Sequence, residues 1–266
     1  MHQPELLDLM IDLALEAGAA IAEIYATDFD SDAKGDGSPV TEADRRGEAI
    51  IEAGLKLGAP DIPILAEEAA SEGHIPELGN RFFCVDPLDG TKEFLTRNGE
   101  FTVNIALIDH GRAVAGVVYA PAIETLYYGA AGEGAFMQKI APGRTRRDAE
   151  PPHEIEARSP LHKDLVAVAS RSHRGPDTDA LLDKIGVSEF TPAGSSLKFC
   201  LVARGSADVY PRLGRTMEWD TAAGQAVLEA AGGRVMALDG ENETGPLGYG
   251  KKERGFDNPH FIAWGR

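Results

Sequence analysis

Residues 82–94 of the chain read Phe82-Phe83-Cys84-Val85-Asp86-Pro87-Leu88-Asp89-Gly90-Thr91-Lys92-Glu93-Phe94. The first four residues predict a buried strand. Because Pro87 has no N–H to donate to a sheet ladder, we expect the chain to leave the sheet at Asp86. Asp89-Gly90 is a turn pair, which places a second carboxylate on a tight loop after the strand. Two carboxylates with a hydroxyl beside them suit a hard divalent cation. For such a motif taken alone, however, a solvated acidic turn is the stronger interpretation.

The composition excludes several classes of protein. The chain has 266 residues, 43% of them hydrophobic, which is enough to bury a sizeable core in one large domain or two moderate ones. Its 26 basic and 43 acidic residues give a net charge of −17, so we exclude nucleic-acid binding and polybasic membrane anchoring. Cys84 and Cys200 lie in apolar runs and are expected to be buried free thiols.

The chain shows no targeting signal and no apolar run that approaches the roughly 18 residues of a membrane-spanning helix. We therefore expect a soluble, cytoplasmic protein. A loose association with the inner face of the membrane is disfavoured by the acidic charge but stays open, as does the choice between a monomer and a homodimer.

Two halves with different periodicity are expected. Residues 1–150 begin with an amphipathic helix over 4–25 and a polar loop over 28–38, whose only base, Lys34, is either solvated or able to close over a ligand. Thr41 caps a second helix, with Asp44 three residues on. A strand over 62–66 and an antiparallel meander over 101–137 follow. Beyond a seam at 141–160, residues 151–266 alternate short strands, including 165–169 and 261–264, with helices over 176–185, 195–203 and 221–231. This alternation predicts an α/β layer behind an α+β layer in one integrated fold.

Further carboxylates lie at the ends of predicted elements. Glu67 follows a strand, and Asp220 precedes a helix over 221–231, which it could equally well cap. If these two side chains converge with Asp86 and Asp89, each unscreened pair at ~4 Å costs on the order of 4 kcal/mol at an effective dielectric of ~20. Such a cluster is tolerable only with cations, and an oxygen-only ligand set favours Mg²⁺ over zinc.

Three motifs resemble the signatures of the inositol monophosphatase superfamily, in order and in spacing, over nearly the whole chain. They are Glu67-Glu68, Asp86-Pro87-Leu88-Asp89-Gly90-Thr91 and Trp219-Asp220-Thr221-Ala222-Ala223-Gly224. Residues 38–44, 89–94, 98–107, 170–173 and 194–199 resemble the 3′(2′),5′-bisphosphate nucleotidase branch of that superfamily, the CysQ type. The inositol-cleaving branch usually has Thr-Asn-Phe where this chain has Thr91-Lys92-Glu93-Phe94.

The resemblance implies a layered α-β-α-β-α sandwich that binds two to three Mg²⁺ ions. Glu67, Asp86 and the carbonyl of Leu88 would hold one ion. Asp86, Asp89 and Asp220 would hold a second, and a third, looser ion would contact Glu67.

The resemblance also implies a role for residues around the phosphate. Thr91, with Glu67 and Asp44, would orient the attacking water, although helix capping remains the alternative role of Asp44. The phosphate would lie over residues 86–91 and the amides of Gly90 and Thr91. The implied phosphate-binding residues are Glu67, Leu88, Asp89, Gly90, Thr91 and Asp220.

The second half is expected to select the substrate. By resemblance His173, Ser195, Lys198 and Arg212 face a nucleoside and its other phosphate, with surface placement or capping as the alternative for each. The implied reaction converts adenosine 3′,5′-bisphosphate, or its sulfated form, to AMP or adenosine 5′-phosphosulfate, within sulfur assimilation. Two alternatives stay open. One is a sibling enzyme for inositol phosphates, fructose bisphosphate or the 2′-phosphate of NADP, and the other is a nucleotide-binding regulator that lacks useful catalysis.

Overall fold

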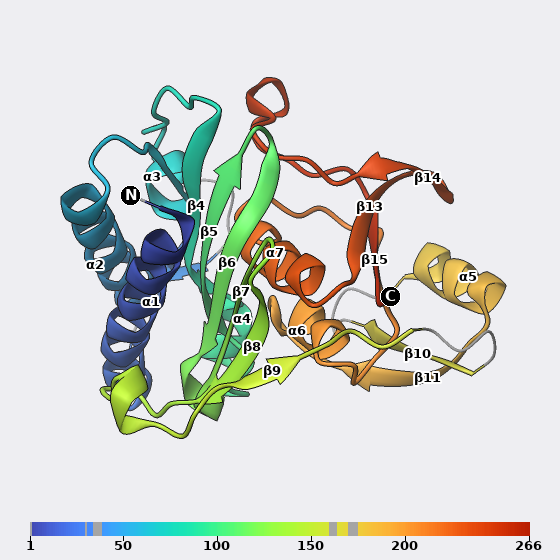
Figure 1. The fold of residues 1–266 in the computed structure, drawn as a ribbon, viewed down its shortest axis with the longest axis horizontal. Helices are drawn as coiled ribbons and strands as arrows, with labels where there is room; N and C mark the ends of the chain where they lie inside the picture. The colour runs from blue at the N-terminus through green and yellow to red at the C-terminus, as the bar shows by residue number, and fades with distance from the viewer. Residues whose placement is uncertain (1, 30, 34–38, 160–163, 170–174) are drawn as a thin grey trace.

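Helices and two β-sheets alternate in five layers across the molecule (Figure 1). The fold is that of a computed structural model, which describes residues 2–29, 31–33, 39–159, 164–169 and 175–266. Helices α1 and α2 cover one face of the first sheet, α6 and α7 lie between the two sheets, and α5 covers the far face of the second. This arrangement confirms the predicted α-β-α-β-α sandwich.

The seven-stranded first sheet has the order β3-β4-β5-β6-β7-β8-β9 and is antiparallel except for the parallel pair β3–β4. Its strands are β3 (Ile64–Ala66), β4 (Arg81–Asp89), β5 (Thr102–Asp109), β6 (Arg112–Ala120), β7 (Thr125–Ala130), β8 (Gly134–Lys139) and β9 (His153–Ile155). The meander predicted for this half is therefore confirmed. It gains β9 from the segment expected to be an irregular seam, because residues 153–155 pair with β8.

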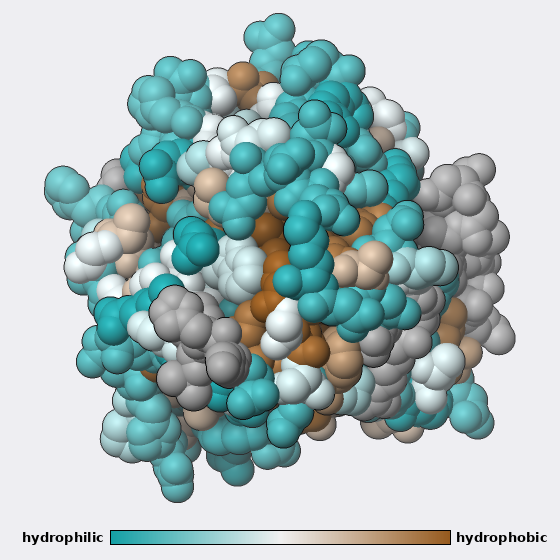
Figure 2. All heavy atoms as spheres, turned by 90° about the vertical axis from the view of Figure 1, so that its right-hand side faces the viewer, coloured by the Kyte–Doolittle hydropathy of each residue, from teal (hydrophilic) through white to brown (hydrophobic). Residues whose placement is uncertain are grey.

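The six-stranded second sheet is mixed and has the order β11-β10-β12-β15-β13-β14. Its strands are β10 (Leu165–Ala169), β11 (Val187–Pro192), β12 (Val209–Arg212), β13 (Arg234–Asp239), β14 (Asn242–Pro246) and β15 (Phe261–Trp264). The two edge strands, β11 and β14, were not expected from the sequence. Seen from the side of this sheet and α5, the surface is largely hydrophilic around a central hollow where hydrophobic side chains gather (Figure 2).

The helices connect and cover these sheets. Their bounds are α1 (Gln3–Tyr25), α2 (Glu42–Gly58), α3 (Glu67–Ser71), α4 (Thr91–Leu95), α5 (Pro176–Ile185), α6 (Leu197–Ala203) and α7 (Ala222–Ala230), with short 3₁₀ turns at Pro121–Ile123, Arg146–Asp148 and Lys252–Arg254. The predicted loop over 28–38 is partly wrong, because β1 (Ser31–Ala33) pairs with β2 (Pro39–Thr41). Lys34 lies outside the described residues.

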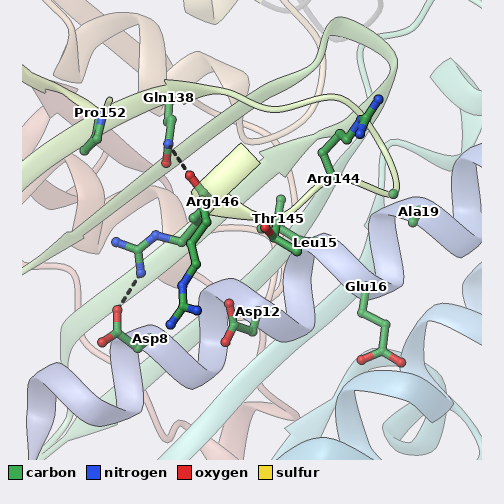
Figure 3. Close-up of a pocket in the computed structure, with 12 residues that line it drawn as sticks. Asp8, Asp12, Leu15, Glu16, Ala19, Gln138, Arg144, Thr145, Arg146 and Pro152 are labelled. Carbon is green, nitrogen blue, oxygen red and sulfur yellow. Dashed lines mark hydrogen bonds and ion pairs between the residues drawn. The ribbon is translucent and has the colours of Figure 1, made fainter. Parts of the chain in front are cut away.

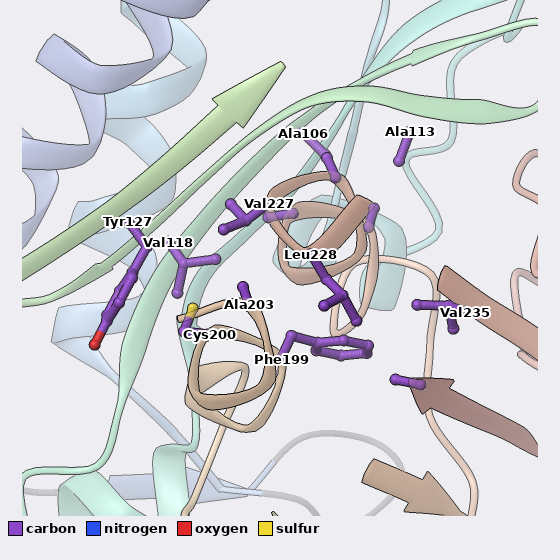
Figure 4. Packing of buried hydrophobic residues seen from close by; sticks show 14 of the residues in the cluster. Ala106, Ala113, Val118, Tyr127, Phe199, Cys200, Ala203, Val227, Leu228 and Val235 are labelled. Carbon is purple, nitrogen blue, oxygen red and sulfur yellow. The ribbon is translucent and has the colours of Figure 1, made fainter. Parts of the chain in front are cut away.

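The layer between the sheets is hydrophobic and joins both halves of the chain. Val118 of β6 faces α7, and Phe199 of α6 packs beside Leu228 of α7 (Figure 4). The helix α7 comes so close to β6 that a Cβ at Gly116 would lie 2.4 Å from the carbonyl oxygen of Ala223. Because all residues of α7 from 222 to 228 are buried, this helix serves as core for both sheets.

The strand β4 continues past the proline that was expected to end it. Asp86 pairs with Asn104 and Asp89 with Thr102, so two residues of β4, at 87 and 88, lie opposite the single residue 103 of β5. This bulge accommodates Pro87, whose missing N–H would otherwise interrupt the ladder. The prediction that the chain leaves the sheet at Asp86 is therefore wrong by three residues, and both carboxylates belong to one strand.

Candidate active site

Four carboxylates from three places in the chain meet at one cavity. Glu67 is the first residue of α3, immediately after β3, and Asp86 and Asp89 flank the bulge of β4. Asp220 directly precedes Thr221, the N-cap of α7. Glu67, Asp89 and Asp220 line a cavity of about 280 Å³, and Asp86 is buried beneath them with 1% of its surface exposed. The convergence expected from the sequence is present.

The carboxylates repel one another strongly. Burial, together with the charges of Glu67, Asp89 and Asp220, raises the pKa of Asp86 well above its ordinary value. Burial and the charges of Asp89 and Glu67 raise the pKa of Asp220 from 3.8 to about 8. Since several buried negative charges are stable only with a compensating positive charge, the cavity is electrostatically prepared for protons or cations.

Asp89 is held in place by a network from the second half of the chain. Its Oδ2 accepts hydrogen bonds from Ser195 Oγ at 2.7 Å and from the backbone N–H and Oγ of Ser196 at 2.6 and 2.9 Å. Asn104 Nδ2 adds a longer bond of 3.4 Å to the same oxygen. Because all of these bonds converge on Oδ2 within the described chain, Oδ1 is left for a ligand.

The same network explains why the helix predicted to start at Ser195 starts two residues later, at Leu197. Ser195 has a left-handed backbone with φ +52°, which a helix cannot contain. Its hydroxyl lies 2.5 Å from Thr102 Oγ1 in addition to its bond to Asp89. Ser195 therefore lines the cavity with its hydroxyl bonded to Asp89, one of the four carboxylates.

Hydrogen bonds hold the turn that carries Asp220. Its Oδ2 accepts the N–H of Met217 at 2.8 Å. Two residues earlier, the fully buried Glu218 accepts the amides of Gly250 and Lys251 at 2.7 and 2.8 Å and pairs with the ammonium of Lys251 at 2.9 Å. The turn that carries Asp220 is therefore fixed to the 250–251 segment.

The residues present suit a hard divalent cation. The donors are carboxylate oxygens, to which the Leu88 carbonyl could add, and these are the ligands that Mg²⁺ prefers. Asp89 and Asp220 each accept hydrogen bonds from the protein through Oδ2. In each carboxylate, Oδ1 is the oxygen that could bind a cation. Within the described residues, no three Asp, Glu, His or Cys side chains are grouped closely enough to hold a metal ion as they stand.

Thr91 and Asp44 lie beside the carboxylates. Gly90, with φ +94°, precedes α4 and turns the chain so that Thr91 starts this helix. The hydroxyl of Thr91 lies 3.3 Å from Asp44 Oδ1 and 3.4 Å from the carbonyl of Leu88. Asp44 Oδ2 accepts the N–H and hydroxyl of Thr41 at 2.7 Å, which completes the predicted cap of α2. The two roles considered for Asp44 are compatible, because each uses a different oxygen.

Two cations from the second half line the opposite wall of the cavity. Lys198 is 7% exposed, burial lowers its pKa to about 8, and its ammonium donates to the carbonyl of Ser195. Arg212 donates to the carbonyl of Arg215 at 3.1 Å, while its buried Nε has no hydrogen-bond partner within the described chain. Tyr210, whose ring centre lies 5.4 Å from the Lys198 ammonium, completes this wall. His173 and the rest of 170–174 lie outside the described residues.

Comparison with known proteins identifies the family. The sequence profile described as the inositol monophosphatase family matches residues 2–259. The chain belongs to this family. The expectation drawn from the three acidic motifs is thereby confirmed.

Similar members of the family carry one name. The 3′(2′),5′-bisphosphate nucleotidase CysQ of Escherichia coli O157:H7 is 45% identical over 96% of this chain and 98% of its own length. The protein of that name from Buchnera aphidicola is 40% identical over 97% of this chain and 93% of its own. The crystal structure of CysQ from Bacteroides thetaiotaomicron, a bacterial member of the inositol monophosphatase family, matches with a TM-score of 0.79 and 40% identity over 97% of this chain and 96% of that one.

Other family members with solved structures are more distant. The inositol monophosphatase from Anabaena superimposes with a TM-score of 0.73 at 27% identity, over 97% of this chain and 90% of that one. In the part of the chain that the structure describes, no helix combines the length and the apolar character needed to cross a membrane.

A second and larger cavity of about 910 Å³ shares no lining residue with the carboxylate cavity of this family member. Asp8, Asp12 and Glu16 of α1 form one wall, and the 144–147 segment with its arginines forms the other (Figure 3). Arg146 pairs with Asp8 at 2.5 Å. Because opposite charges face each other here, this cavity is not suited to an anionic substrate.

Sequence reasoning missed three residues that support the site. Asn104 and Thr102 of β5 hold the Ser195–Ser196 turn and Asp89, and Glu48 of α2 bonds to α3. Both β5 residues fall within the 98–107 motif, but their serine partners lie 93 and 92 positions away, so the motif did not indicate these bonds. Glu48 did carry a local signal, because it lies one helical turn after Asp44 and therefore on the same face of the helix.

Proposed function

We propose that this chain is a Mg²⁺-dependent 3′(2′),5′-bisphosphate nucleotidase that removes the 3′-phosphate of adenosine 3′,5′-bisphosphate and leaves AMP. We further propose that it accepts the sulfated form of that nucleotide and serves sulfur assimilation. The observation that carries the proposal is the juxtaposition of four carboxylates with Lys198 and Arg212 around one cavity. The names of the relatives at 40–45% identity support the same activity.

In this proposal the metal ligands come from both halves of one integrated fold. Glu67, Asp86 and the Leu88 carbonyl would hold one Mg²⁺, Asp86, Asp89 and Asp220 would hold a second, and Glu67 would contact a third, looser ion. Residues 1–150 supply most ligands, and residues 151–266 supply Asp220. The bound ions would promote ionisation of a water near neutral pH and neutralise the charge on the leaving oxygen.

The chain's own residues orient the reactants. The hydroxyl of Thr91 donates a hydrogen bond to Asp44. Its oxygen can therefore accept a hydrogen bond from the attacking water. Glu67 adds a second acceptor on the same side of the cavity. The phosphate lies over Asp89 and the amides of Gly90 and Thr91.

The nucleotide extends toward the second half. Arg212 lines the cavity, and its guanidinium can donate hydrogen bonds to a phosphate oxygen of the substrate. Lys198 adds positive charge to this part of the cavity on an otherwise acidic protein. We assign His173 to the same subsite on the resemblance alone. Ser195 belongs here through its carbonyl, which holds Lys198.

The test is phosphate release from adenosine 3′,5′-bisphosphate and from inositol 1-phosphate, each with Mg²⁺ and with EDTA. We expect Mg²⁺-dependent release with a strong preference for the nucleotide. Preference for the inositol ester would leave the metal chemistry intact and refute the assignment of Lys198 and Arg212. Tight nucleotide binding without Mg²⁺-dependent turnover would refute catalysis and favour a regulator.

A further inference from the structure

The short helix α3 begins with Glu67 but lacks a cap of its own. It has only five residues, and its N-cap is Ala66, which has no side-chain acceptor. The first N–H groups of any helix have no acceptor within the helix and need one from elsewhere. Glu67 is therefore the first residue of a helix whose first N–H groups need an acceptor from another element.

Glu48 of α2 supplies the missing acceptors. Its Oε2 accepts the N–H of Glu68 at 2.8 Å, and its Oε1 accepts the N–H of Ala69 at 2.8 Å. The side chain is buried, with 7% exposed. Burial raises the pKa of Glu48 to about 7, while the two amide bonds lower it, and the ionised carboxylate is the form that accepts both bonds at once.

The face of α2 that carries Glu48 also contacts Thr91 at the start of α4. Asp44 precedes Glu48 by four residues, which places both side chains on one face of the helix. Asp44 accepts from the hydroxyl of Thr91, and Glu48 accepts from the two amides that follow Glu67. One rigid helix of 17 residues therefore contacts both segments.

We propose that Glu48 is a positioning residue that sets the place of Glu67 relative to Asp86 by holding the first turn of α3. This rests on the proposed function, in which Glu67 is a metal ligand. A bidentate acceptor fixes both the translation and the rotation of the turn, from which the Glu67 carboxylate already reaches hydrogen-bond distance of Asp86. Groups that orient metal ligands in this way typically change metal affinity by about 10- to 100-fold when removed.

The deciding variant is Glu48→Gln, which keeps the size of the side chain. Its one oxygen can accept a single amide, and its NH₂ group would face the N–H of the other, so one of the two bonds is lost. The matched control is Glu52→Gln, the same charge change one turn further along α2, where the carboxylate pairs with Lys56 at the surface. Glu48→Asp keeps the charge but is one methylene shorter, and it replaces Glu48→Gln should that variant not fold.

Three quantities are measured at pH 8, above the pKa of about 7 to which burial raises Glu48. They are the Mg²⁺ dissociation constant by calorimetry without substrate, the KM for adenosine 3′,5′-bisphosphate at saturating Mg²⁺, and the hydrogen exchange of the Glu68 and Ala69 amides. We expect Glu48→Gln to weaken Mg²⁺ binding about tenfold or more, to leave KM within about twofold, and to speed exchange at these two amides. Glu52→Gln should match the wild type in all three.

The outcomes separate this proposal from the proposed function. If Glu48→Gln folds and binds Mg²⁺ within about twofold of the wild type, or if Glu52→Gln weakens binding equally, the positioning role is refuted. A cap that only stabilises α3 would speed amide exchange without changing Mg²⁺ affinity, which also refutes it. If the wild type itself binds Mg²⁺ but does not hydrolyse the nucleotide, the proposed function fails while the positioning of Glu67 stands.

Discussion

Replacing Asp220 by asparagine should make the metal-free protein more stable and the enzyme inactive. Asparagine keeps the shape of the side chain and can still accept the N–H of Met217 through its remaining oxygen. Asparagine lacks the negative charge that Asp89 and Glu67 repel in the wild type. The variant therefore isolates the electrostatic cost of the carboxylate cluster from its packing.

The size of the effect follows from the pKa of Asp220, which is raised from 3.8 to about 8. At about 1.4 kcal/mol per pH unit, ionising this buried group costs the native state roughly 6 kcal/mol at most. A proton taken up by any carboxylate of the cluster relieves part of the repulsion. We therefore expect the free energy of unfolding of Asp220→Asn to exceed that of the wild type by about 2–4 kcal/mol at pH 8. Because the native state holds a proton that the unfolded chain has released, the wild type loses stability as pH rises from about 4 to about 8.

The assay is urea denaturation in EDTA at pH 5 and pH 8, repeated at pH 8 with Mg²⁺. In EDTA the advantage of Asp220→Asn should be small at pH 5 and full at pH 8. At a concentration 100 times its dissociation constant, Mg²⁺ should stabilise the wild type by about 2.7 kcal/mol and the variant much less. The reasoning is refuted if the variant is less stable than the wild type at pH 8 in EDTA, or if Mg²⁺ stabilises both proteins equally.

Three further predictions concern water orientation, substrate binding and packing. Thr91→Ala should lower kcat about 10²-fold or more without weakening Mg²⁺ binding, and Thr91→Ser should restore most of it, as measured by steady-state kinetics across Mg²⁺ concentrations. Arg212→Gln should raise the KM for adenosine 3′,5′-bisphosphate about 10- to 100-fold but leave that for phenyl phosphate unchanged; an equal rise for both esters would contradict the contact with the second phosphate. Gly116→Ala should destabilise the fold by about 1–3 kcal/mol in urea denaturation, because the new methyl group would lie 2.4 Å from the Ala223 carbonyl oxygen, whereas Gly79→Ala, with open space around it, should not.

Local sequence signals predicted much of this fold. The strand at 165–169, the helix at 176–185 and the strand at 261–264 are found at the expected residues, because each is bounded by clear breaks in an apolar pattern. The family and the sandwich were also predicted correctly from the three acidic motifs. The sequence placed the carboxylates at the ends of elements and left their convergence as a condition, and the structure brings them to one cavity.

What the sequence did not reveal depends on contacts between distant residues. The bulge at Pro87 forms because Asn104 and Thr102 pair on either side of it, and a proline alone indicates only that a ladder is interrupted. The polar edge strands β11 and β14 lack an apolar alternation and exist through their neighbours. Glu48 contacts residues 20 and 21 positions away, and only the placement of α3 makes it an acceptor.

The position of β15 has a consequence for how the chain is made. This strand, Phe261–Trp264, lies in the interior of the second sheet and joins β12 to β13. During synthesis β12 and β13 therefore leave the ribosome without the strand that connects them, and one side of α7 has no finished sheet to pack on. The nascent chain exposes apolar surface until these residues emerge, which makes this interval the one in which chaperones would protect it from aggregation.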